Sequence, residues 1–140
     1  MISILVQDTK SFMLKLFKEN MFDDYYVPSV EIISFANFEI STKRSPCTWQ
    51  VIRPYVHNII KGNKTPKHIK IIFSLNKEES EKLQQGCEFF INMYFNEGAL
   101  YFTTGTSSKT FSLNKTYELL WEDFVKKLFA NNLITFTLME

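Results

Sequence analysis

The hydrophobic residues of this chain switch repeatedly between two spacings, and this switching limits the possible folds more than any motif does. Residues 69, 71, 73 and 75 are apolar, which is the period-2 pattern of a half-buried strand. Residues 117, 120, 121, 124, 128 and 129 are apolar at the spacing of one face of a helix. The same patterns predict strands at 2–6, 30–40, 88–95, 99–104 and 134–138, and apolar residues return to helical spacing from near residues 9 and 49.

The predicted order of elements is βαβ(β)αβαβββαβ. The segment 30–40 forms one long strand or a hairpin around Ala36-Asn37, and a third short strand is expected at 110–112 after the hairpin at Asn96-Glu97-Gly98. Because this central hairpin interrupts any regular parallel winding, we predict an α+β fold. Its sheet is mainly antiparallel, with about six or seven strands and three or four helices.

Helix ends are also marked in the sequence. Asp8 or Thr9 can cap the first helix, and Asn76 followed by Glu79 is a capping box for a short helix that ends at Gly86. Pro54 lies inside the pattern of the second helix. Since proline lacks an N–H and fits the first helical turn, we predict that the regular helix begins near Pro54.

Length and composition indicate one domain over residues 1–140. The chain has four glycines, four prolines and no linker-like tract. No secretory signal or apolar run of membrane-spanning length occurs, so we expect a cytoplasmic protein that does not enter a membrane. Cys47 and Cys87 lack metal-ligand spacing, so we expect reduced thiols, with no metal site and no cofactor.

Basic charge is concentrated in residues 40–77. This segment holds eight of the 16 basic residues and none of the 15 acidic ones. Cations at a helix end also complement the helix dipole, which explains part of the pattern. We expect a non-enzymatic domain that docks an acidic protein partner through this segment. The alternative is a nucleic acid or other polyanion, with Trp49 or Tyr55 available for stacking. The candidate binding residues in this segment are Arg53, Lys61, Lys64, Lys67 and His68.

Residues 103–109, Thr-Thr-Gly-Thr-Ser-Ser-Lys, resemble an anion-binding turn. Hydroxyls, a glycine and a lysine can together hold a phosphate or carboxylate. The alternative is that this composition marks only a hairpin turn without a ligand. Gly105, Ser107 and Lys109 complete the candidate site. No catalytic motif occurs, so an enzyme with a site near this loop is the third alternative. It would require Asp23, His57, His68 or the loop to converge on one pocket.

Several segments together resemble a family of uncharacterised bacterial proteins of this length, typical of Firmicutes. The resemblance covers the whole chain, including the opening strand and Phe22-Asp23-Asp24. It implies a bacterial cytoplasmic protein with a domain of unknown function, and it supplies no activity or catalytic residues. The segments that carry it are Trp49, Ile52-Arg53-Pro54, residues 59–66, residues 70–73 and residues 103–111.

Overall fold

A computed structural model describes residues 1–61, 66–109 and 115–139. Its elements follow the order βαββαβαββαβ, which agrees with the predicted order. The strand expected at 110–112 lies outside the described residues. The elements are β1 (Ser3–Val6), α1 (Thr9–Lys18), β2 (Tyr26–Ile33), β3 (Asn37–Ser41), α2 (Trp49–Lys61), β4 (His68–Ser74), α3 (Lys77–Leu83), β5 (Cys87–Asn96), β6 (Ala99–Ser108), α4 (Thr116–Asn131) and β7 (Phe136–Met139).

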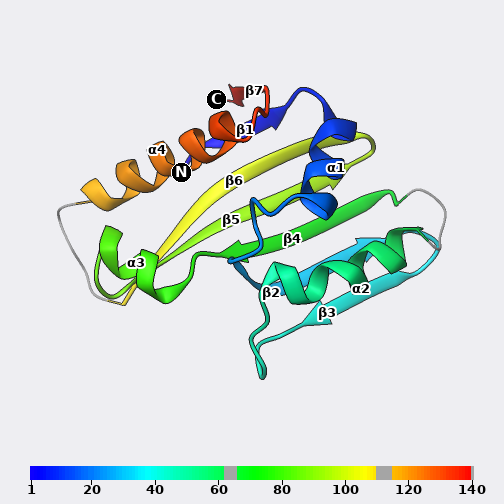
Figure 1. Ribbon diagram of the computed structural model, residues 1–140, viewed down its shortest axis with the longest axis horizontal. Coiled ribbons are helices and arrows are strands. Elements are labelled where there is room, and N and C mark those ends of the chain that lie inside the picture. Colours follow the sequence, from blue (N-terminus) through cyan, green and yellow to red (C-terminus); the bar gives the residue numbers. More distant parts are fainter. Residues whose placement is uncertain (62–65, 110–114, 140) are drawn as a thin grey trace.

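The seven described strands form one sheet in the order β3-β2-β4-β5-β6-β1-β7, and every neighbouring pair is antiparallel. The α+β prediction is therefore confirmed. The four helices of the described residues lie on the same side of the sheet (Figure 1). Within this part of the chain the opposite side carries no helix, and we call it the open face.

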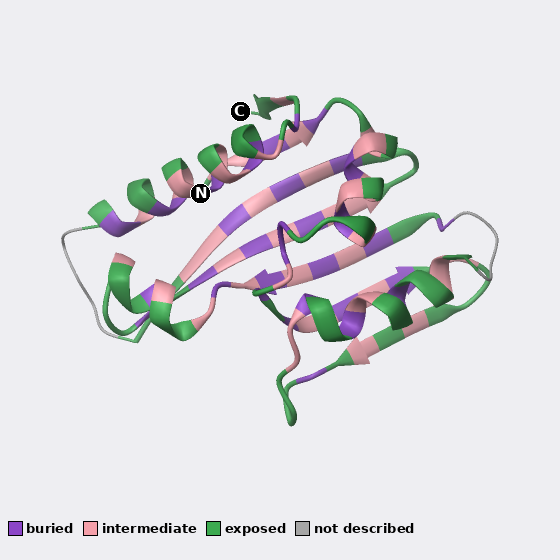
Figure 2. Ribbon diagram, viewed as in Figure 1, coloured by how far each residue is buried: buried purple, intermediate pink, exposed green. Residues whose placement is uncertain are grey.

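Alternation along the strands separates the two faces. In β5, Phe89, Ile91 and Met93 are fully buried beneath the helices, whereas the residues between them are half-buried. Figure 2 shows this banding along the central strands. The core is rich in aromatic contacts: the Phe22 and Phe73 rings stack with centroids 4.4 Å apart. Burial of one residue in two against the helices is what holds the layers together.

The second helix begins earlier than predicted. It starts at Trp49, so Pro54 lies inside it and the expected late start is wrong. Trp49 and Val56 are fully buried and Ile52 nearly so, at a spacing of three and four residues. Burial of Trp49 and Ile52 requires a helical first turn, and this packing outweighs the hydrogen bond that Pro54 cannot donate.

Two further differences concern the hairpin and the last helix. β6 continues to Ser108, so residues 103–108, expected as a turn, form its second half. In α4 the buried stripe is Tyr117, Trp121, Val125 and Phe129, whereas Leu120 is 47% exposed. The true stripe has a strict four-residue spacing and uses Val125, which the predicted stripe omitted.

Among the described residues, no helix combines the length and apolar character needed to span a membrane.

Candidate functional site

The basic residues of segment 40–77 are distributed over both sides of the sheet. Arg53 and Lys61 lie on α2 in the helical layer. His68 and Lys70 lie on β4 at alternate positions to the buried Ile69, which places them on the open face. Lys67 directly precedes β4, and Lys64 lies outside the described residues. The described basic residues therefore do not gather on one surface.

Arg53 is occupied by contacts within the protein. Its Nη1 atom lies 3.0 Å from Asp23 Oδ1 and donates a hydrogen bond to the Glu19 carbonyl at 2.8 Å. The Arg53 side chain is 22% exposed. These contacts tie α2 to the chain that connects α1 with β2, so Arg53 has a structural role and is not available to an external anion.

Gly105, Ser107 and Lys109 lie far from the start of β4. Ser107 is paired with Glu88 at one end of β5, and His68 is paired with Asn96 at the other end. Eight residues of extended chain separate these positions, a distance of about 27 Å. Because residues 103–108 form a strand, they also lack the tight turn that an anion nest requires. The turn expected at 103–108 is therefore a strand, and anion binding by Gly105, Ser107 and Lys109 stays a prediction.

The groups named for an enzyme site do not converge. Asp23 is paired with Arg53, as above. His57 lies on α2 with its ring 5.2 Å from that of Phe17, and His68 lies on the open face of the sheet. These side chains occupy separate places in the fold, so an active site built from them is not supported. Among the described residues no group of three or more His, Cys, Asp or Glu side chains is placed to hold a metal ion.

The groove where α1 and α2 face each other is the best candidate for a docking site. We call it the α1/α2 groove; its volume is about 440 Å³. Asp8 begins α1 by accepting a hydrogen bond from the Ser11 N–H, and the buried Phe12 and Leu16 hold that helix against the sheet. The residues that line the groove are Thr9, Lys10, Met13, Leu14, Phe17, Lys18, His57 and Ile60.

Helical geometry explains how this lining is arranged. Phe12 and Leu16 face the sheet, and the next residues around α1, Met13 and Phe17, line the groove. Trp49 contacts two residues of α1 near the groove. Its Nε1–H donates a hydrogen bond to the Leu16 carbonyl at 2.9 Å, and its ring centroid lies 5.6 Å from that of Phe17. The groove therefore has an apolar lining fixed by buried contacts.

The rim of the groove is positively charged. Lys10, Leu14 and Lys18 recur every four residues along α1, with Leu14 56% exposed between the two lysines. Neither α1 nor α2 contains an acidic residue. Among the described residues, Lys10 and Lys18 form no ion pair, whereas Lys15 pairs with Glu19 at 3.5 Å.

Sequence reasoning did not find the α1 side of this site. The acid-free segment in the sequence begins at Ile40, so it includes His57 and Ile60 of the groove but not Lys10 and Lys18. A usable signal was present: α1 carries lysines on its outermost stripe and no acid. What the sequence does not show is that α1 and α2 lie next to each other.

Comparison with known proteins gives a family but no activity. No curated protein and no solved structure matches the chain significantly. Residues 41–137 match the model of DUF5721, a family of unknown function. The match includes α2 but begins after α1, so it covers one wall of the α1/α2 groove. Since it spans more than half of the chain, this protein belongs to the DUF5721 family.

Proposed function

We propose that this protein is a non-enzymatic interaction domain that docks an acidic, amphipathic segment of a partner protein in the α1/α2 groove. The observation that carries the proposal is the combination of an apolar lining with a rim of unpaired lysines. An apolar groove between helices is a known way to bind the apolar face of a partner helix. Lysines at its rim would attract and orient acidic residues on that partner.

The spacing of the rim lysines suggests a spacing for the partner. Lys10 and Lys18 are eight residues apart on α1, which corresponds to about 12 Å along the helix axis. A partner helix with two acidic residues about two turns apart, and leucine-like side chains between them, would match both lysines and cover Leu14. We therefore still propose an acidic partner. The proposed docking surface is the α1/α2 groove, in place of segment 40–77 as a whole.

The groove supports a protein partner more than a nucleic acid. Phosphate recognition uses many cations, with stacking platforms for bases. Trp49, one of the two aromatic residues considered for stacking, is fully buried, while Tyr55 is 66% exposed on α2. The groove lining itself is largely apolar. We infer that the protein acts in the bacterial cytoplasm, where Cys47 and Cys87, both free, would remain reduced.

Fluorescence polarisation with designed probes tests this function. The probe is a labelled amphipathic peptide of about four helical turns with leucine on one face and glutamate on the other. We expect this peptide to bind, with an affinity that falls as the salt concentration rises. The matching peptide with lysine in place of glutamate should bind at least tenfold more weakly. A single-stranded DNA of similar length serves as the polyanion probe.

Two groove variants and one control locate the binding. Leu14→Asp and Lys18→Glu should each lower the affinity for the glutamate peptide by about tenfold or more. Lys109→Glu makes the same charge change at an exposed position after β6 and should leave binding within about twofold. Equal binding of the two peptides, an equal effect of Lys109→Glu, or tighter binding of the DNA would contradict the proposal.

A further inference from the structure

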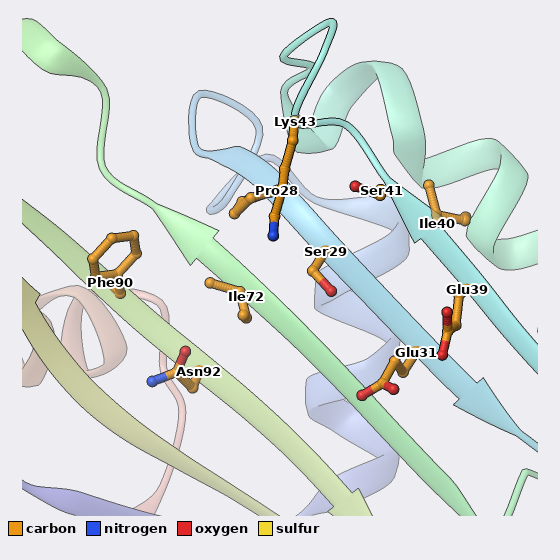
Figure 3. Close-up of a pocket in the computed structure, with 10 residues that line it drawn as sticks. All are labelled: Pro28, Ser29, Glu31, Glu39, Ile40, Ser41, Lys43, Ile72, Phe90 and Asn92. Atoms are coloured by element: carbon orange, nitrogen blue, oxygen red, sulfur yellow. The ribbon is translucent and has the colours of Figure 1, made fainter.

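The open face of the sheet contains a hollow of about 540 Å³, a size typical of small-molecule sites. It lies over β3, β2, β4 and β5, on the side of the sheet away from the helices (Figure 3). Strand register assembles it: Ser41 is paired with Ser29, Ser29 with Ile72, and Ile72 with Asn92. We call it the sheet hollow. It shares no lining residue with the α1/α2 groove.

Two carboxylates stand at one end of the sheet hollow. Glu39 and Glu31 are direct register partners on β3 and β2, which places their Cβ atoms about 5 Å apart. Like charges directly opposite each other destabilise a sheet. Among the described residues neither glutamate forms an ion pair, although Glu39 Oε1 accepts a hydrogen bond of 3.5 Å from Asn37 Nδ2. Lys70, the other register partner of Glu31, has its Nζ atom 5.7 Å from the centre of the Tyr94 ring.

An ammonium group stands at the other end. Figure 3 shows Lys43 extending over the hollow, with its Nζ atom near Pro28 and Ser29 and away from the two carboxylates. The hollow therefore has opposite charges at its two ends. Ile72 lies in the middle of the hollow and Phe90 at the end away from the carboxylates (Figure 3); both supply apolar surface and both are half-buried.

We propose that the sheet hollow binds a small zwitterion, namely a free amino acid or dipeptide with an apolar side chain. Its ammonium group would lie between Glu31 and Glu39, which would relieve their mutual repulsion. Its carboxylate would pair with Lys43, and its side chain would cover Ile72 and Phe90. Charge-assisted hydrogen bonds of this kind are stronger than neutral ones, and both ends of the ligand would make them.

Other ligand classes fit the lining less well. A phosphate or other simple anion would meet two carboxylates and one ammonium among the side chains that line the hollow. A divalent cation is disfavoured because no metal-binding group of three or more ligands exists among the described residues. A neutral apolar ligand would leave both charged ends without partners.

Isothermal titration calorimetry with four leucine derivatives tests the proposal. The probes are L-leucine, L-leucyl-L-leucine, N-acetyl-L-leucine, which lacks the ammonium group, and L-leucinamide, which lacks the carboxylate. We expect leucine or dileucine to bind, and each singly charged derivative of leucine to bind at least tenfold more weakly. The first two probes distinguish a free amino acid from a dipeptide.

Variants then assign each end of the ligand to a side chain. Glu39→Gln should lower the affinity for leucine and leucinamide about tenfold but leave the affinity for N-acetyl-leucine unchanged. Lys43→Gln should lower the affinity for leucine and N-acetyl-leucine but leave the affinity for leucinamide unchanged. Glu88→Gln, on the same face at the far end of β5, is the matched control. Circular dichroism confirms folding, which Glu39→Gln should not impair because it removes a like-charge contact. No binding of either zwitterion, equal binding of the capped derivatives, or an equal effect of Glu88→Gln would overturn the proposal.

Discussion

Replacing Trp49 with phenylalanine tests how the helical layer is held together. Trp49 is fully buried, and its Nε1–H donates a 2.9 Å hydrogen bond to the carbonyl of Leu16. Leu16 belongs to the last turn of α1, where carbonyls lack donors within the helix. Trp49 therefore acts as a cap for α1 supplied from α2, 33 residues further along the chain.

The expected cost combines two effects. Leaving the buried Leu16 carbonyl without its donor costs about 1–3 kcal/mol. The smaller phenyl ring leaves space beside Phe17 and Phe73, whose ring centroids each lie 5.6 Å from that of Trp49, and this adds about 1 kcal/mol. Trp49→Phe should therefore lower the free energy of unfolding by about 2–4 kcal/mol, or lower the melting temperature by roughly 6–15 °C.

Urea unfolding measures this loss, and Trp121 provides the matched comparison. Trp121 is also buried, but its hydrogen bond to the Phe90 carbonyl is longer, 3.1 Å, and only partly buried. Trp121→Phe should therefore cost less than Trp49→Phe. The chain has two tryptophans, so each variant keeps one as a fluorescent reporter. A loss below about 1 kcal/mol for Trp49→Phe, or one no larger than for Trp121→Phe, would refute the capping argument.

Two further predictions concern local features. Burial, with a smaller contribution from the Glu79 carboxylate, raises the pKa of the Tyr25 hydroxyl above its usual value of 10.0. The folded state then holds this proton more tightly than the unfolded chain, so stability should fall as the pH rises above about 10. Tyr25→Phe should therefore reduce the loss of stability at alkaline pH, as measured by urea titrations. Since Tyr25 Oη has no hydrogen-bond partner among the described residues, the substitution should not destabilise the protein at neutral pH. An unchanged loss of stability at alkaline pH would contradict the assignment. At the β5–β6 turn, Glu97 and Gly98 have φ angles of 49° and 89°. Because asparagine tolerates this conformation better than glutamate, Glu97→Asn should stabilise by about 0.5–1 kcal/mol in thermal melts, and a loss of stability would count against this turn geometry.

Local patterns predicted most of the fold because each depends on neighbours in the chain. The period-2 runs gave strands, and Asn76 does accept the capping hydrogen bond from the Glu79 N–H at 2.9 Å. The failures occurred where distant contacts outweighed local preference. Pro54 favours a helix start, but burial of Trp49 extends α2 by five residues towards the N-terminus. Residues 103–108 have turn-like composition, but pairing with β5 makes them a strand.

The sequence by itself determined the alternation of helices and strands, the antiparallel class of the sheet and the acid-free character of segment 40–77. Only the tertiary structure decided which charges share a surface. Arg53 turns inward to Asp23, the lysines of α1 join α2 across a groove, and Glu31 and Glu39 meet through strand register. Periodicity reports which face of an element is apolar, but which elements become neighbours depends on packing between residues distant in the chain. Both proposed sites are made by such neighbours.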